Sequence, residues 1–211
     1  MTVLQTPNPI TVTVDVLSAS VTVIASERTD SVVEIRPADA AKKADVRAAA
    51  QTLVDFTAGA LTVTTPKNWR TYTPFGGNPS IEILIEVPVG SLLESTAGVG
   101  KLVSVGEFGS TTLEVAAGDI VVESPRGAVS AKVAKGDIRV SDASNGELRL
   151  ETSYGELEVG IRPGSAASLE TNVKQGAVQN LMQPVGKDAE VVRVHARNSF
   201  GNIIVRHAVA A

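Results

Sequence analysis

The sequence predicts an all-β fold, a parallel β-solenoid in which short strands stack in successive coils. Glycines recur through residues 100–164 at steps of nine residues, with one step of ten. After most of these glycines the residues two and four places on are apolar, which is the alternation of a half-buried strand. Such a period indicates stacked coils rather than hairpins, because Asn145-Gly146 is the one tight-hairpin dipeptide of the Asn-Gly or Asp-Gly type.

Pairing every second unit gives a coil of about 18 to 19 residues with two strands. One set of glycines then stacks at Gly100, Gly118, Gly136 and Gly155, and a second at Gly109, Gly127 and Gly146. The inward columns read Leu102, Ile120, Ile138, Leu157 after the first set and Thr111, Val129, Leu148 after the second, at a strand spacing of roughly 4.8 Å. Outward, Glu114, Lys132 and Glu151 alternate in sign, and Arg139 lies beside Glu158, which stabilises neighbouring strands by ~0.2–1 kcal/mol per pair.

The N-terminal third is expected to cap one end of the solenoid, because a stack of strands exposes unpaired edges at both ends. Residues 39–50 are rich in Ala, Lys and Arg with little β-branching, and they predict the one helix. Residues 53–56 and 61–65 predict a hairpin across Thr57-Ala58-Gly59. Further strands are expected at 10–16, 20–25, 32–36 and 81–87.

The chain is expected to form one continuous domain with three parts. Residues 1–90 form the N-terminal β cap and the first coils, and residues 91–180 form the regular repeats. Pro184 and Gly186 break the period, and residues 181–211 form a closing coil. Its strands, at 191–195 and 202–206, are expected to close the C-terminal end of the stack.

Aromatic residues are scarce, so the core must consist of Val, Ile, Leu and Ala. Three of the seven aromatics lie in the irregular segment 66–80. One interpretation makes this segment a partner-binding loop that uses Trp69, Arg70, Tyr72 and Phe75. The alternative is that its rings fold over the open end of the solenoid. Aromatic rings also precede corner glycines, and we expect them to cover those corners at Phe108, Tyr154 and Phe200.

Composition and charge exclude several classes of protein. The net charge of −4 gives no basic footprint for nucleic acid, and no apolar run reaches the eighteen or so residues of a membrane span. Cysteine is absent, which excludes disulfides and thiolate chemistry. Residues 1–10 carry no basic residue and no long apolar run, so we expect no secretory signal and a cytoplasmic location.

Asp119, Asp137 and Glu156 share one outward column beside Lys101 and are the candidate catalytic group. Carboxylates on adjacent coils would lie about 5 Å apart, which is near the separation of a retaining glycosidase pair. These residues follow corner glycines, however, where acidic side chains are ordinary solvated turn chemistry. A polysaccharide-active enzyme therefore stays a remote alternative, and we predict no catalytic residue.

Metal and cofactor sites are not predicted either. The two histidines, His195 and His207, have no cysteine partners and do not make a zinc site. The glycine motifs are repeat corners with no helix after them, so no dinucleotide site is expected.

Several segments resemble the bacterial putative-adhesin β-helix proteins, a family of unknown function, and its soluble actinobacterial branch in particular. The segments are Val21–Asp30, Val32–Pro37, Glu86–Ser91, the Gly-Asp-Ile units and Glu151–Gly164. The resemblance implies a β-helical, non-enzymatic protein with no catalytic residues to carry over. An adhesin label would rest on fold-level analogy.

We therefore expect a structural or scaffold protein, or an adhesin-like one, that acts through surface contacts or self-association. The ends of the strand ladders can pair with other chains, so a homo-oligomer is expected. The alternative function is a module that binds a glycan or a protein through the 66–80 loop. The identity of that partner is unknown from the sequence.

Overall fold

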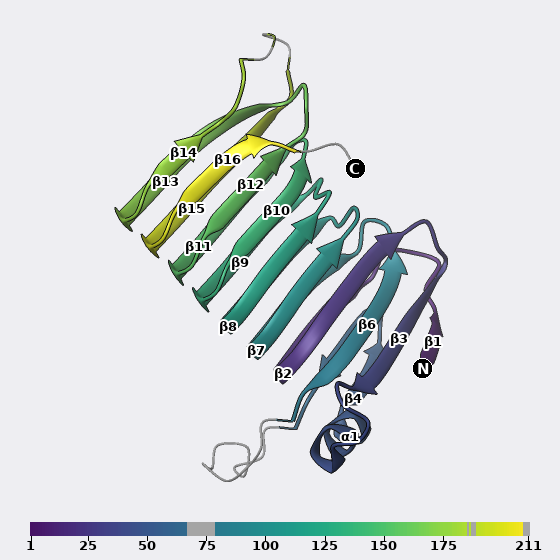
Figure 1. The fold of residues 1–211 in the computed structure, drawn as a ribbon. Coiled ribbons are helices and arrows are strands. Elements are labelled where there is room, and N and C mark those ends of the chain that lie inside the picture. The colour runs from purple at the N-terminus through teal and green to yellow at the C-terminus, as the bar shows by residue number, and fades with distance from the viewer. Residues whose placement is uncertain (67–78, 185, 187–188, 209–211) are drawn as a thin grey trace.

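The computed structural model describes residues 1–66, 79–184, 186 and 189–208. In this part of the chain the regular structure is β apart from one short helix, and the strands form a mixed sheet of 16 strands (Figure 1). The all-β prediction is confirmed. The sheet combines parallel and antiparallel pairs, and the antiparallel ones lie in its N-terminal part.

Most elements follow the predicted segments. The strands expected at 10–16 and 20–25 instead form one strand, because the pairing with residues 92–105 continues from Thr11 to Ile24. The N-terminal part holds β1 (Thr2–Gln5), β2 (Thr11–Ser26), β3 (Asp30–Pro37), α1 (Lys43–Gln51), β4 (Leu53–Thr57), β5 (Ala60–Thr64) and β6 (Ile81–Pro88). The middle holds β7 (Leu92–Val105), β8 (Ser110–Glu123), β9 (Ala128–Lys135), β10 (Ile138–Ala143), β11 (Glu147–Tyr154) and β12 (Leu157–Ile161). The C-terminal part holds β13 (Ala166–Gln175), β14 (Val178–Asn180), β15 (Val191–Phe200) and β16 (Ile203–His207).

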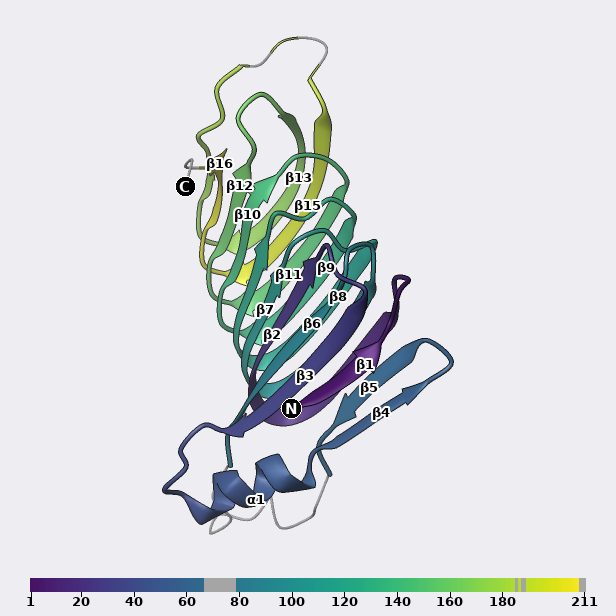
Figure 2. The same cartoon turned by 90° about the vertical axis from the view of Figure 1, so that its right-hand side faces the viewer.

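The strands lie in two rows, and the chain alternates between them. The first row runs β6-β2-β7-β8-β10-β12-β16-β14, and the second runs β5-β2-β7-β8-β9-β11-β15-β13. The long strands β2, β7 and β8 contribute their N-terminal halves to the second row and their C-terminal halves to the first. All pairs along these two rows are parallel, and Figure 2 shows the connecting turns stacked along the molecule.

The predicted register is confirmed in both rows. In the first row Ile120 pairs with Leu102 and Ile138, and Ile138 pairs in turn with Leu157. In the second row Thr111, Val129 and Leu148 pair in the same order. These side chains are buried, so equivalent aliphatic residues of successive strands form a continuous core.

The corner glycines allow the close approach of neighbouring turns. Gly118 has a φ of +136°, and a Cβ built on it would lie 1.7 Å from the carbonyl oxygen of Gly100. At Gly136 the same construction places a Cβ 1.9 Å from the oxygen of Gly118. No larger residue fits at such a distance, so glycine is required both by the conformation and by the space.

Antiparallel strands and the helix cover the N-terminal end of the stack. β3 pairs antiparallel with β6, β1 with β3, and β4 with β5 as the predicted hairpin. The helix was expected from residue 39 but begins at Lys43, because residues 39–42 form a turn instead. In that turn Asp39 accepts hydrogen bonds from the backbone N–H groups of Ala41, at 2.9 Å to its carboxylate, and of Lys42, at 3.1 Å to its carbonyl.

The order of strands at the C-terminal end differs from the expectation that the last two strands close the stack. β15 and β16 lie inside it, between β11–β12 and β13–β14, so that β13 and β14 form the outer edge. The physical reason is burial: β15 turns Val192, Val194 and Ala196 fully into the core, whereas Leu169 and Val173 of β13 are partly exposed. The more apolar strand takes the interior position.

Candidate functional site

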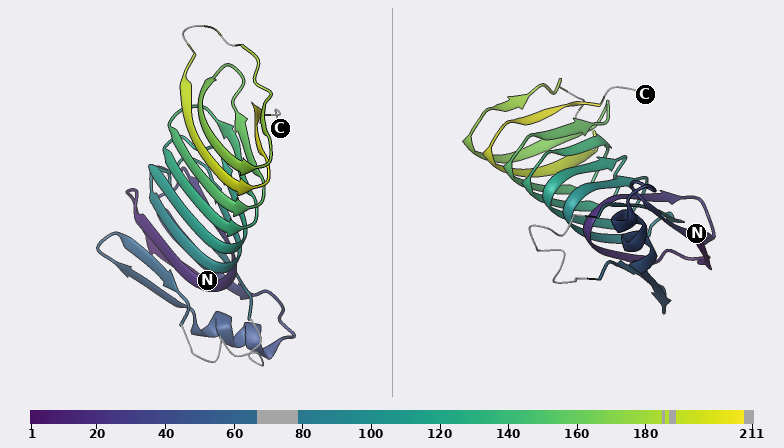
Figure 3. Two further views of the ribbon diagram at one scale, coloured as in Figure 1. Left: turned by 90° about the vertical axis from the view of Figure 1, so that its left-hand side faces the viewer. Right: turned by 60° about the horizontal axis from the view of Figure 1, so that its bottom comes forward.

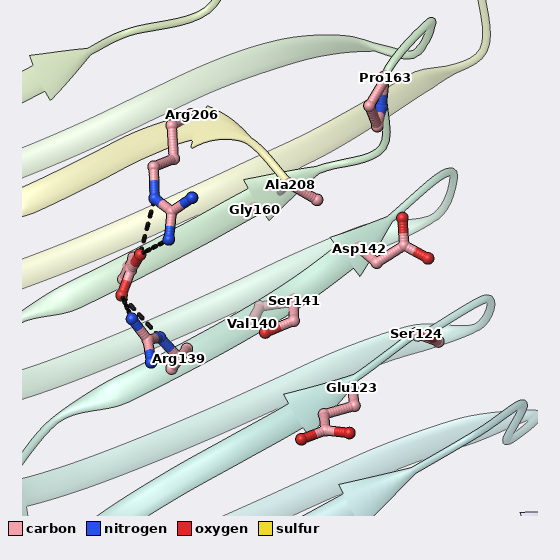
Figure 4. A pocket seen from close by; sticks show the side chains of 11 residues that line it. Glu123, Ser124, Arg139, Val140, Ser141, Asp142, Gly160, Pro163, Arg206 and Ala208 are labelled. Atoms are coloured by element: carbon pink, nitrogen blue, oxygen red, sulfur yellow. Dashed lines mark hydrogen bonds and ion pairs between the residues drawn. The ribbon is translucent and has the colours of Figure 1, made fainter. Parts of the chain in front are cut away.

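A groove of about 560 Å³ lies on the outward face of the first row (Figure 4). Four neighbouring strands, β8, β10, β12 and β16, supply its walls. Its charged and polar lining comprises Glu123, Arg139, Ser141, Asp142, Glu158 and Arg206. The groove follows from the strand stacking, because outward residues at equivalent positions of parallel neighbours must lie side by side.

Glu158 is the centre of an ion-pair network in this groove. Arg139 donates from Nε to Oε2 over 2.7 Å, and Arg206 donates from Nε to Oε1 over 2.8 Å. Each guanidinium also makes a second bond to the same carboxylate. Figure 4 shows the two arginines converging from opposite sides. The predicted neighbours Arg139 and Glu158 are thus confirmed, and Arg206 is an additional partner.

The electrostatics of Glu158 follow from this arrangement. Its side chain is only 17% exposed, and burial alone would raise its pKa. Hydrogen bonds from Arg206 and Arg139 outweigh burial, so that the pKa lies below its ordinary value of 4.5. The carboxylate is therefore held in its ionised form, which suits a fixed structural charge better than a proton donor.

The strand β10, which lines the groove, contains a β-bulge. Val140 pairs with Val159 and Ala143 with Ile161, so Ser141 and Asp142 together face a single residue of β12. Asp142 takes a φ of +58° in the left-handed region. Its carboxylate accepts a hydrogen bond from Nε of Arg162 at 2.9 Å, and this bond lowers the pKa of Asp142 below its ordinary value.

Arginines therefore hold both Glu158 and Asp142 in this groove. Among the residues that the structure describes, no cluster of His, Asp and Glu is placed to hold a metal ion. The arrangement offers fixed charges and hydrogen-bonding groups on a stiff surface, which can contact a polar partner. The pKa values of Glu158 and Asp142 are both lowered, which is the opposite of the shift that an acid catalyst needs.

The acidic column of the sequence prediction has a structural role. Oδ1 of Asp119 accepts a hydrogen bond from the backbone N–H of Asp137 at 3.0 Å. Asp137 in turn accepts one from the N–H of Glu156 at 2.7 Å. Asn202 does the same for the N–H of Ala177 at 3.1 Å. These side chains satisfy backbone groups of the next strand where the chain turns, in agreement with the turn interpretation.

The aromatic residues are divided between described and undescribed parts of the chain. The loop residues Trp69, Arg70, Tyr72 and Phe75 lie outside the residues that the structure describes. Phe108 is buried at its corner, as expected. Tyr154 and Phe200 are instead 56% and 42% exposed and stack on each other, with ring centroids 4.7 Å apart and planes 2° apart.

Sequence reasoning did not find the groove as a site, although one signal was present. The single ten-residue step of the glycine period, from Gly136 to Gly146, spans the bulge at Ser141 and Asp142. An inserted residue in an otherwise constant repeat is a local sign of a bulge. The hydrogen bonds from Arg206 to Glu158 could not be predicted from the glycine period, since they depend on which strand lies next to β12.

Comparison with known proteins finds similarity in structure and not in sequence. No family model and no curated protein sequence matches it. A putative cell adhesion protein from Clostridium sporogenes matches 98% of this chain and 98% of its own at 11% identity, with a TM-score of 0.61. A putative adhesin from Parabacteroides distasonis matches 97% of this chain and 95% of its own at 11% identity, with a TM-score of 0.33.

A putative adhesin from Parabacteroides merdae covers 95% of this chain and 94% of its own at 12% identity, with a TM-score of 0.29. In the described residues no helix has the length and apolar character needed to cross a membrane. The Clostridium structure establishes a shared fold with this chain over nearly the full length of both proteins.

Proposed function

We propose that this chain is a non-enzymatic, adhesin-like member of the bacterial putative-adhesin family that works by making contacts through its surface. We further infer that its two rows of strands are the two sides of a β-solenoid. Partner residues are 18 positions apart at Gly100 and Gly118 and 19 apart at Ile138 and Leu157, which supports coils of that length. The shared fold with the putative cell adhesion protein also supports this proposal.

The observation that carries the proposal is the continuity of the outward charges. Lys132 pairs with Glu151, and Glu151 pairs with Arg197, on three successive strands of the second row. The first row has its own network around Glu158. Charges of alternating sign in register stabilise the stack and display a long polar face, so binding energy is spread over a surface rather than concentrated in a cleft.

An adhesion assay tests the proposal. Beads coated with the full chain are applied to surfaces carrying bacterial cell-wall polysaccharide, the same chain, or serum albumin as a blank. We expect saturable attachment to the polysaccharide or to the chain above the albumin level, and no release of reducing sugar. Beads coated with heat-unfolded chain are the control and should not attach. Attachment at the albumin level on both test surfaces contradicts the proposal, and sugar release favours an enzyme.

A further inference from the structure

The two ends of the strand stack differ in a way that bears on self-association. Both views of Figure 3 place the N-terminal hairpin and helix at one end and the last strands at the other. The outermost N-terminal strands, β1 and β4, have only 4 and 5 residues and pair antiparallel with their neighbours. The C-terminal edge is β13, a strand of 10 residues whose pairing within the described chain is with β15 alone.

β13 has few of the features that protect an edge strand. Its sequence, Ala166–Gln175, contains no proline, and its one lysine is matched by one glutamate. Leu169 and Val173 pack against the core and remain partly exposed, and Val178 and Leu181 beyond the strand are exposed. A long parallel edge with half-covered apolar side chains is a template for another strand.

We propose that two copies of this chain dimerise edge to edge through β13, antiparallel about a two-fold axis at Asn172. This inference rests on the proposed function, because it identifies one of the surface contacts through which the chain would act. In that register Glu170 of each copy faces Lys174 of the other, so the strand is complementary in charge to itself. The unlike ends of the stack favour a closed dimer over head-to-tail filaments.

The backbone of β13 permits this pairing. The N–H of Ala166 donates to the carbonyl of Glu190 at 2.7 Å, so even-numbered residues direct their backbone groups to the strand at the inner side. By alternation, Thr171 and Val173 direct theirs to the open edge. The alternation ends after Val173, because the carbonyl of Gln175 accepts a hydrogen bond of 2.9 Å from the N–H of Gly201 on the inner side. Thr171 then exchanges hydrogen bonds with Val173 of the second copy. Glu170 and Lys174 take the non-hydrogen-bonded positions, where side chains of opposite strands come closest.

Other registers lose the charge match. An axis at Glu170 or at Lys174 sets like charges directly opposite each other, which is destabilising. An axis at Thr171 or Val173 leaves both charges opposite uncharged positions. Glu170 is 76% exposed although its Oε2 lies 2.9 Å from Nδ1 of His195, so its other oxygen is accessible to a lysine of the second copy.

Sedimentation equilibrium over a range of protein concentrations is the first test. We expect a concentration-dependent species of twice 21.8 kDa. Lys174→Glu sets glutamates opposite each other at both contacts and should weaken dimerisation about tenfold or more. Adding Glu170→Lys to that variant restores opposite charges and should recover the dimer. Lys43→Glu, on the helix at the other end, is the matched control and should leave dimerisation unchanged.

Cysteine crosslinking tests the register itself, because the chain has no cysteine of its own. Asn172→Cys should give a covalent dimer on mild oxidation, since facing residues at such a position lie within disulfide range. Ser168→Cys should not give a covalent dimer. In this register Ser168 faces Gly176 of the second copy, so the two introduced cysteines lie eight residues apart along the strands. A monomer at all concentrations, or equal crosslinking of both variants, overturns the inference. If beads still attach to polysaccharide while the chain stays monomeric, the edge pairing fails and the proposed function stands.

Discussion

The carboxylate of Asp119 accepts a hydrogen bond of 3.0 Å from the backbone N–H of Asp137, the equivalent residue directly before the next parallel strand, β10. The same contact recurs between Asp137 and Glu156. The aspartates that follow Gly118 and Gly136 therefore each tie one turn to the next. The column that resembled a catalytic pair in the sequence serves the stacking of the turns.

Replacing the acceptor should lower stability without affecting the fold. We expect Asp137→Ala to reduce the free energy of unfolding by about 0.5–1.5 kcal/mol, because the N–H of Glu156 loses its partner. Asp137→Asn keeps an acceptor oxygen, so it should reduce the free energy of unfolding by clearly less than Asp137→Ala does. Urea denaturation followed by circular dichroism measures both. Equal losses for the two variants would show that the charge matters rather than the hydrogen bond.

Substitution of a corner glycine should be far more damaging. A Cβ at Gly118 would lie 1.7 Å from the carbonyl oxygen of Gly100, so we expect Gly118→Ala to cost more than about 3 kcal/mol or to prevent folding. Gly164 also has a positive φ, of +93°, but a Cβ there meets no atom of the described part of the chain within 4 Å. Gly164→Ala should cost only about 1 kcal/mol of backbone strain. Thermal denaturation of the two variants tests this prediction. Similar melting temperatures would contradict the argument that close packing requires glycine at position 118.

Removal of an unsatisfied buried hydroxyl should be neutral or stabilising. Ser104 lies in a column of valines, between Val23 and Val122, and its buried Oγ has no hydrogen-bond partner among the residues that the structure describes. We expect Ser104→Ala to change the free energy of unfolding by about 0 to +1 kcal/mol in the stabilising direction. Thr152 is the control, because its Oγ1 donates to the carbonyl of Gly136 at 3.0 Å. Thr152→Ala should destabilise by about 1 kcal/mol, and a loss of that size at Ser104 would refute the prediction.

The ion-pair network should make part of the stability dependent on pH. The pKa of Glu158 is lower in the folded protein than its ordinary value of 4.5, so the folded state binds protons less readily than the unfolded one. Its contribution is therefore fully present above pH 4.5 and is lost as the pH falls through the lowered pKa. The pKa of Asp142 is lowered in the same sense by Arg162.

Glu158→Gln should remove this dependence. At pH 7 we expect it to destabilise by about 1–2 kcal/mol, a figure reduced for the exposure of Arg139. Because Gln cannot titrate, the difference from the unmodified chain should shrink as the pH falls below about 4.5. Urea midpoints at several pH values between neutral and acidic measure this. A difference that stays constant with pH would mean that the carboxylate contributes no charge-dependent stability.

Much of the fold could be predicted from two kinds of signal: residues with a strong local conformational preference, and residues that recur at a constant period. The recurring glycines indicate where the backbone bends, as it does at Gly118 between the two halves of β8. The alternation of Ile120 and Val122 indicates a strand with one buried face. Repetition at a constant period then fixes which residues stack. The helix boundary was less well predicted, since the turn at Asp39 competes with the helix for the same residues.

The candidate site could be predicted only in part. Arg139 and Glu158 belong to adjacent repeats, so the period places them together. Arg206 reaches Glu158 because β16 returns to lie next to β12, 48 residues along the chain. No period relates these two residues.

The sequence by itself determined the strand pattern, the register of the repeats and the glycine corners, because each depends on steric and hydrophobic preferences that neighbouring residues share. Only the tertiary structure decided the order of strands at the two ends: β2 lies between β6 and β7, and β15 lies inside β13. Several apolar strands could occupy each interior position, and the choice depends on which arrangement buries the most apolar surface across distant segments. That competition left β13 as the open edge.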